Sequence, residues 1–407
     1  IFNPLVFRAD MASVILEDLG LKTKGLRQYI TSRKKFFSSQ ERTEKLKKWI
    51  SPEDNAEEID LKMIGVITRA PQASVFAILI NMLESCCSHG HCDPHADPKG
   101  WADIQKLGLE DSYWGLIRET FGFERENPSF PALLISLLIT DFANNLSGDL
   151  PIGLKQFLLT DSNKSLNATV FVSQWRSSMD HCWSFDLISN YYAGELKIKD
   201  HLTAYDLQSL IYSSTFEVIE QKIIRSLVGN ILAGDGAGFE AVRDQIAQRR
   251  DEYWAKMETK PYGQIYEALS MAVSLFDLRR KYSEGLSYPD ARSMHEAYTK
   301  ELFLFDQYYR KYHQSADAVE ASGIDILKPL DSAVEACYTE WFMSQISLAW
   351  GNFMEHGLLE ELHTLPGVRQ YQFYSTKVKP YLAKQDKNRI FVIISDAFRY
   401  EAAEELT

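Results

Sequence analysis

Long apolar runs, alternating strand patterns and regularly spaced cysteines are all scarce in this sequence of 407 residues. The longest nearly apolar stretch, residues 131–139, is about half of a membrane-spanning helix, so we expect no membrane contact. The five cysteines are odd in number and irregular in spacing, which favours a reduced, cytoplasmic protein over a disulfide framework. The net charge of −12 disfavours non-specific binding of the whole chain to nucleic acid or an anionic membrane.

The composition that is present is typical of an ordinary globular protein. Hydrophobic residues make up 45% of the chain and aromatic residues 12%, which argues against disorder. The length allows two or three domains, each with its own core. We expect a helical domain at residues 1–160, a second helical domain at 161–371, and the start of a different domain at 372–407.

Helical periodicity dominates the chain before residue 387. The clearest case starts at Ser214, which with Glu217 has the spacing of a capping box. Only residues 167–172 fit a short strand as well. The pattern therefore predicts a mainly α fold of multi-helix domains. In the clearest case, apolar residues recur every three or four positions until Gly234: Phe216, Ile219, Ile223, Leu227 and Ile231.

The end of the chain, KNRIFVIISDAFRYEAAEELT (residues 387–407), has a different pattern. Five apolar residues at 390–394 predict a strand buried on both faces, as in a parallel sheet. A lone strand cannot satisfy its backbone groups, so we expect the first β-α unit of a truncated α/β domain. Asp396 follows this strand, where open α/β folds bind ligands. An Asp before a helix is also a common N-cap, and the spacing leaves both roles open.

The string VIISDAFRYEAAEEL (residues 392–406) resembles the opening of the PglZ domain, a branch of the alkaline phosphatase superfamily. Upstream, VFRADMASVILEDLGL, KIIRSLVGNILAG and FYSTKVKPYLAK look like the helical region that precedes the catalytic domain in type-A PglZ proteins of BREX (bacteriophage exclusion) defence systems. The resemblance covers most of the chain. It implies a helical region followed by only the first strand and helix of an alkaline-phosphatase-like domain.

The resemblance also implies a metal-dependent phosphatase or phosphodiesterase. Asp396 would then bind one divalent cation, Zn²⁺ or Mn²⁺, of a two-metal site, while the nucleophilic hydroxyl would lie beyond Thr407. A haloacid-dehalogenase-type phosphatase would carry a second Asp at the position of Phe398, which counts against that class. Arg399 faces either a phosphate or solvent, and we favour solvent. We expect the chain alone to be inactive and to bind no metal tightly.

A basic region lies near the start of the chain. Residues 22–48 contain ten Lys or Arg and two Glu, a local charge of 10 − 2 = +8. Interleaved cations and aromatic residues are typical of surfaces that bind DNA or another polyanion. The alternative is that Phe36, Phe37 and Trp49 belong to the core and the cations form a solvated face. The candidate polyanion ligands are Arg33, Lys34, Lys35, Lys45, Lys47 and Lys48.

Two further stretches contain residue types that often carry chemistry. CCSHGHCDPHADP, residues 86–98, offers cysteine, histidine and aspartate ligands from Cys86 to His95 and beyond, but structural zinc sites usually need a second, separated pair. We expect a polar loop that binds metal weakly or not at all. GDGAG, residues 234–238, looks like a phosphate-binding loop but follows a helix, so we expect a helix C-cap and a turn.

Two functions of different class follow from these patterns. The first is a portion of a metal-dependent phosphohydrolase of a BREX system. The second is a non-catalytic helical module that docks other BREX-system proteins or DNA. A nucleophilic Ser or Thr and further Asp or His ligands downstream of Asp396 would identify the enzyme.

Overall fold

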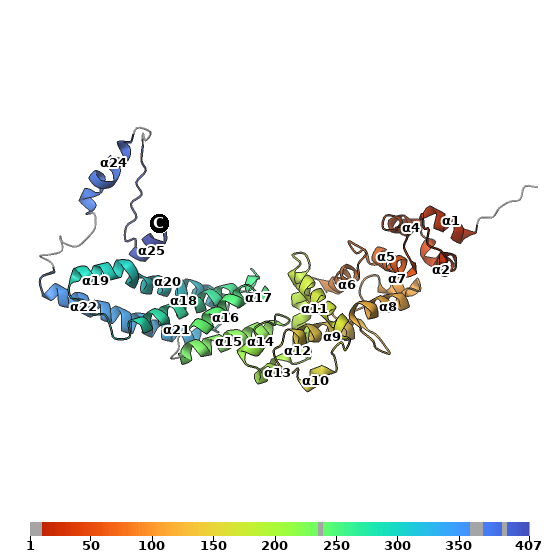
Figure 1. The fold of residues 1–407 in the computed structure, drawn as a ribbon, viewed down its shortest axis with the longest axis horizontal. Coiled ribbons are helices and arrows are strands. Elements are labelled where there is room, and N and C mark those ends of the chain that lie inside the picture. Colours follow the sequence, from red (N-terminus) through yellow and green to blue (C-terminus); the bar gives the residue numbers. More distant parts are fainter. Residues whose placement is uncertain (1–9, 89, 235–238, 359–368, 385–388, 407) are drawn as a thin grey trace, which may run out of the picture. The chain divides into compact units, whose positions relative to one another are not determined.

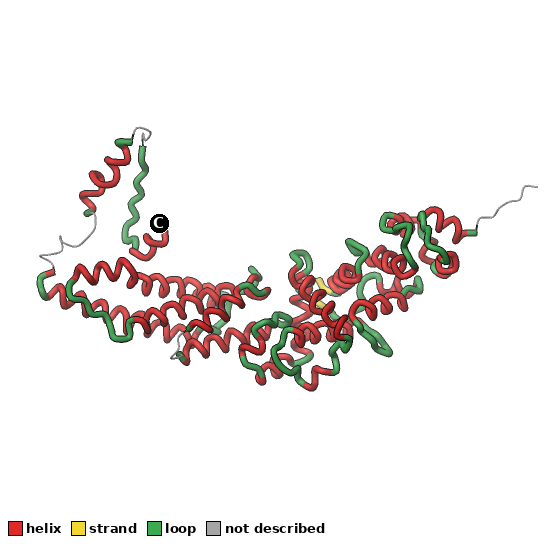
Figure 2. The backbone as a smooth tube through the Cα atoms, viewed as in Figure 1, coloured by secondary structure: helices red, strands yellow, loops and turns green. Residues whose placement is uncertain are grey.

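The computed structural model describes residues 10–88, 90–234, 239–358, 369–384 and 389–406. Helices dominate these residues, and their one sheet is a two-stranded antiparallel hairpin (Figures 1 and 2). The predicted mainly α fold is confirmed. The chain divides into two compact units, Ile1–Ile223 and Ile224–Thr407. The domain limits expected at residues 160 and 371 stay a prediction.

The first unit is built from capped helices of short to moderate length. Asn55, for example, forms a capping box with Glu58, because its side chain accepts the Glu58 N–H while the Glu58 carboxylate accepts the Asn55 N–H. The elements of this unit are α1 (Met11–Asp18), α2 (Leu26–Ser32), α3 (Lys34–Phe37), α4 (Gln40–Lys47), α5 (Ala56–Thr68), α6 (Val75–Glu84), β1 (Cys87–Ser88), β2 (His91–Cys92), α7 (Trp101–Lys106), α8 (Glu110–Phe121), α9 (Phe130–Asn144), α10 (Ile152–Lys155), α11 (Ser162–Ser177), α12 (Cys182–Glu195), α13 (Ile198–His201), the 3₁₀ turn η1 (Leu202–Ala204) and α14 (Leu207–Leu210).

Aromatic side chains hold part of this unit together. Trp101 of α7 lies edge-to-face against Tyr113 and Trp114 of α8 and against Phe130 of α9, with ring centroids 5.0–5.7 Å apart. All four side chains are buried. Edge-to-face contacts of this kind add to the stabilisation from burial, so this cluster fixes the packing of α7, α8 and α9.

The second unit is a helical bundle in which α18 and α20 pack against each other along their length (Figure 1). Two π-helical turns each join two α-helices, η2 between α19 and α20 and η3 between α21 and α22, and a third, η6, leads into α24. Its elements, after α15 (Glu217–Ala233), are α16 (Glu240–Arg250), α17 (Tyr253–Lys256), α18 (Tyr262–Lys281), α19 (Ala291–Ala297), η2 (Tyr298–Leu302), α20 (Phe303–Ala321), α21 (Lys328–Glu335), η3 (Ala336–Phe342), α22 (Met343–Glu355), the 3₁₀ turn η5 (Gln370–Gln372), the π turn η6 (Tyr374–Val378), α24 (Lys379–Leu382) and α25 (Tyr400–Leu406).

The structure confirms the strongest helical pattern and corrects two strand predictions. The five periodic apolar residues from Phe216 to Ile231 are all buried, although α15 begins only at Glu217. Residues 167–172 lie inside α11 and are not a strand. Residues 390–394 are not a strand either, because no segment among the described residues pairs with them.

Among the residues that the structure describes, no helix combines the length and the apolar character needed to cross a bilayer.

Candidate functional site

The segment before α25 exposes the residues that the sequence predicts to be buried. Residues 389–399 form no helix or strand, and Ile393 and Ile394 are 92% and 87% exposed. An inner strand is stable only when strands on both sides accept and donate its backbone hydrogen bonds. The described part of the chain provides no such neighbours, so the apolar run stays in solvent.

Asp396 lies in a turn between this run and α25. Its Oδ1 accepts the N–H of Ala397 at 3.0 Å, and Ala397 has a left-handed φ of 52°. The helix starts four residues later, at Tyr400, with Arg399 at the N-cap position. Asp396 therefore does not cap α25. Its carboxylate is exposed and makes no ion pair within the described residues, which leaves Oδ2 available to a ligand.

Arg399 points back to the bundle. Its Nε lies 3.8 Å from Oε1 of Glu401, which is only 1% exposed. Burial lowers the pKa of Arg399, but the neighbouring Tyr338 and Glu401 raise it above its ordinary value. The side chain is still 58% exposed. Arg399 is therefore tethered to the bundle at one end and open to solvent at the other.

Helix α25 docks on η2 and α20. The Tyr400 ring packs against Phe303 at 5.4 Å between centroids, and its hydroxyl donates to the carbonyl oxygen of Thr299 at 3.0 Å. Glu405 pairs with Arg310 at 2.6 Å and with Lys311 at 2.5 Å. These contacts join the helix that follows Asp396 to the bundle (Figure 1).

A buried carboxylate, Asp306, links three segments of the bundle near the docking site of α25. Asp306 of α20 accepts hydrogen bonds from the hydroxyls of Tyr298 at 2.8 Å and Tyr338 at 2.6 Å. Burial, followed by the nearby Asp306, raises the pKa of both tyrosines, so they stay protonated and donate. These two hydrogen bonds link η2 and η3 to α20, the helix beside which α25 packs.

Arg33, the first of the predicted polyanion ligands, is committed inside the fold. Its Nε donates to Asp60 at 2.9 Å, and its other nitrogens donate to Ser112 and to the carbonyl oxygen of Gly108. Only 17% of the side chain is exposed. Arg33 links α2 to α5 and α8, so it is not available to a polyanion.

The other predicted cations are exposed, and the structure divides them by their partners. Lys45 pairs with Glu41 and Lys47 with Asp18, each at 2.6 Å. Lys34, Lys35 and Lys48 make no ion pair within the described residues. The neighbouring Phe36 and Phe37 are buried, at 0% and 8% exposure, and belong to the core.

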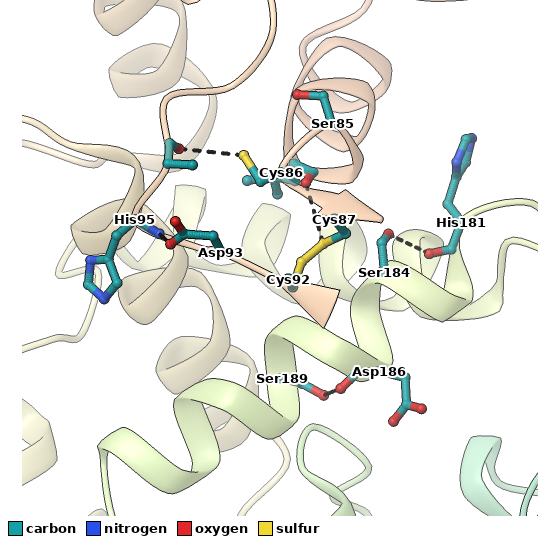
Figure 3. The surroundings of a disulfide bond; sticks show 12 residues. Ser85, Cys86, Cys87, Cys92, Asp93, His95, His181, Ser184, Asp186 and Ser189 are labelled. Atoms are coloured by element: carbon teal, nitrogen blue, oxygen red, sulfur yellow. Dashed lines mark hydrogen bonds between the residues drawn. A yellow bond between two sulfur atoms is a disulfide. The ribbon is translucent and has the colours of Figure 1, made fainter. Parts of the chain in front are cut away.

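The cysteine-rich loop contains a disulfide bond that the sequence did not predict (Figure 3). The β1–β2 pairing sets Cys87 directly opposite Cys92, which brings their sulfurs together. This single bond differs from the expectation of a reduced protein, while Cys86, Cys182 and Cys337 are reduced thiols. Cys86 instead donates to the carbonyl oxygens of Met82 and Ala96, and burial raises its pKa to about 11.

The potential metal ligands of this loop do not converge. His95 contacts the Tyr191 hydroxyl at 3.0 Å and lies to one side of the disulfide in Figure 3. The structure contains no group of three or more His, Cys, Asp or Glu side chains suited to a metal among the residues that it describes. His89 lies outside the described residues. Residues 235–238 of the glycine-rich stretch also lie outside them, but its first residue, Gly234, follows the end of α15 with a left-handed φ of 57°.

Comparison with known proteins finds a family match at the end of the chain. Residues 373–407 match the family described as the BREX system PglZ alkaline phosphatase-like domain. This match includes Asp396, Arg399 and α25. The predicted resemblance to PglZ proteins is confirmed. The family match by itself covers only the end of the chain.

Two curated relatives extend the similarity to nearly the whole chain. The alkaline phosphatase-like protein BrxZ of Escherichia coli O9:H4 (strain HS) is 34% identical over 403 residues, 98% of this chain and 46% of the relative. The alkaline phosphatase-like protein PglZ of Bacillus cereus (strain H3081.97) is 26% identical over 403 residues, 98% of this chain and 45% of the relative. The chain thus spans about half the length of these relatives. No solved structure matches it.

Proposed function

We propose that this chain is part of a cytoplasmic, metal-dependent phosphohydrolase of a BREX defence system, acting on phosphate monoesters or diesters. The observation that carries the proposal is the match of residues 373–407 to the PglZ domain, with Asp396 exposed two residues after the apolar run. In this proposal residues 390–394 form the first strand of the phosphatase sheet, and the upstream helices form its scaffold.

Asp396 is the residue of this chain that would hold a divalent cation, Zn²⁺ or Mn²⁺. Its exposed carboxylate fits, because hard oxygen ligands suit such ions and Oδ2 is unoccupied by hydrogen bonds within the described chain. A pair of bound cations would polarise the phosphoryl oxygen and stabilise charge on the entering and leaving oxygens. One carboxylate alone binds metal weakly, so the remaining ligands must come from other residues.

Arg399 has a separate role in this proposal, which is to contact the phosphate group. Arg399 lies three residues after Asp396, and its side chain interacts with Glu401 of α25 and with Tyr338 of η3 in the bundle. A guanidinium in that position would attract a phosphate group. We propose a weak phosphate contact for Arg399 and no role as an acid or base.

The experiment compares residues 1–407 with a version extended to the full length of the relatives. Hydrolysis of p-nitrophenyl phosphate and its bis ester is measured with Mn²⁺ or Zn²⁺. We expect turnover only in the extended protein, and Asp396→Ala should remove both turnover and bound metal. The matched control is Asp317→Ala, which removes an exposed acid from α20. Full activity of extended Asp396→Ala would refute the ligand assignment.

The second candidate is a non-catalytic module that docks other BREX-system proteins. Helix α22 favours it, because none of its residues is buried and Leu348 is 66% exposed. Exposed apolar surface of this kind marks interaction sites. If the extended protein is inactive with every metal, while Leu348→Glu abolishes binding to a purified BREX-system protein, the docking function is the better conclusion.

A further inference from the structure

A pocket of about 280 Å³ opens between the end of α4 and the second half of α5. Its apolar lining is formed by Trp49, Gly65, Val66 and Ala70. Lys45, Lys48 and Arg69 line it as well, and all three are exposed. We call this the Trp49 pocket. It combines an aromatic and apolar lining with positive charge.

The pocket is built by local features of the sequence. A side chain at Gly65 would bring its Cβ to 2.5 Å from Cζ3 of Trp49, so only glycine allows the indole to approach α5 this closely. Leu46, which is fully buried, anchors α4 beside it. Arg69 ends α5 in the left-handed conformation, with a φ of 59°, and Ala70 closes the turn by donating to Gly65.

The charges of the pocket are not neutralised by the rest of the fold. Lys45 pairs with Glu41, but that pair is exposed and therefore weak. Lys48 and Arg69 make no ion pair within the described residues. Of the cations predicted from the sequence, only Lys45 and Lys48 line this pocket, and Arg69, which was not among them, lines it as well.

We propose that the Trp49 pocket binds one nucleotide unit of a single-stranded nucleic acid. The base would stack on or beside Trp49, and Lys48 and Arg69 would contact the flanking phosphates. Trp49 is half-buried and lines the pocket beside these cations. Positive charge combined with an accessible aromatic surface is the pattern by which proteins hold single strands without sequence preference. A duplex keeps its bases stacked and paired, so it could offer only its phosphates. A pocket of this size is also below the usual range for whole cofactors.

The proposal does not depend on Asp396 or on phosphatase activity, so it can fail or succeed independently of the proposed function. The test is fluorescence anisotropy of a labelled oligo(dT) of about 16 nucleotides, the upper site size of one single-strand-binding module, added to the chain. The test variant is Lys48→Glu with Arg69→Glu. The control, Lys106→Glu with Lys155→Glu, makes the same change in net charge at two exposed lysines elsewhere in the first unit.

We expect the test variant to bind at least about tenfold more weakly and the control to bind like the wild type. Because each phosphate contact on a single strand contributes about 0.7 to the slope of log K against log salt, losing two contacts should reduce that slope by about 1.4. Unchanged affinity in the test variant, or an equal loss in the control, would overturn the pocket as the binding site.

A second arm tests the aromatic part. An oligonucleotide of the same length without bases should bind the wild type at least about fivefold more weakly, the lower limit for loss of one stacked base. Trp49→Leu should bind both oligonucleotides alike, whereas Trp49→Phe should keep the preference. Circular dichroism checks that each variant folds. If the wild type itself binds the two oligonucleotides equally, stacking in this pocket is refuted, whatever the variants do.

Discussion

Residues 389–399 and helix α25 are neighbours in the sequence and reach opposite states in this chain. The first is apolar and exposed, whereas the second is amphipathic, folded and docked on α20. A helix satisfies its backbone hydrogen bonds within itself and needs only a surface for its apolar face. A strand depends on partners that are distant in the sequence. The difference shows that a helix can fold on a neighbouring surface where an apolar run without strand partners stays exposed.

The largest effect is expected from creating a cavity in the core of the bundle on which α25 docks. Phe305 of α20 is fully buried and stacks on Phe342 with 4.3 Å between ring centroids. Phe305→Ala should lower the free energy of unfolding by about 3–5 kcal/mol, because it leaves a cavity. Urea unfolding measures this. Leu348→Ala, at a side chain that is 66% exposed, is the control and should stay within about 0.5 kcal/mol.

A smaller effect is expected from releasing α25 alone. Arg310 lies 3.6 Å from Glu401 and 2.6 Å from Glu405. Arg310→Ala should favour undocking by about 1–3 kcal/mol, because it leaves the buried Glu401 carboxylate without this cation. Amide hydrogen exchange should speed up at residues 400–406 and stay slow in α18. Equal acceleration in both helices would mean that α25 is not a separate unit.

Acid should release α25 in the same way. The hydrogen bond from Lys311, then that from Arg310, lowers the pKa of Glu405 below its ordinary value of 4.5. A lowered pKa in the folded state means that Glu405 stabilises docking above pH 4.5 and loses this contribution as pH falls through its folded pKa. Exchange at residues 400–406 should therefore speed up below about pH 4.5. Glu405→Gln should remove this part of the pH dependence.

The same contrast explains what could be predicted from the sequence. The three-to-four spacing from Phe216 to Ile231 predicts a helix because its cause is local. The run at residues 390–394 carries an equally clear pattern, but its strand needs distant partners. The spacing also could not reveal that Arg33 binds Asp60 and Ser112, or that Tyr338 binds Asp306, because these residues meet only through tertiary packing.

The same distinction between local patterns and tertiary contacts applies to the candidate sites. Asp396 was selected by its place after an apolar run, which is a local signal. Arg69 was missed, because it joins Lys48 at the Trp49 pocket only when α5 packs against α4. Glycine at position 65 was the available clue, since a close approach of two helices often requires one. That clue gains meaning only once the packing of α4 and α5 is known.

The smallest effect in this chain is expected at the apolar run itself, and it gives the sharpest test of the comparison. Ile393 is 92% exposed, so Ile393→Asp buries no charge and should change the free energy of unfolding of residues 1–407 by less than about 0.5 kcal/mol.

In a version extended to the length of the relatives, the proposed strand would lie between two neighbours, and the same substitution would bury an unpaired carboxylate. There we expect a loss of more than about 2 kcal/mol, while Ile393→Val should lose about 0.5–1.5 kcal/mol. Thermal unfolding of both lengths measures the four variants side by side. A large loss in residues 1–407 would mean that the run is already packed there, and no loss in the extended protein would mean that residues 390–394 are not an inner strand of the phosphatase sheet.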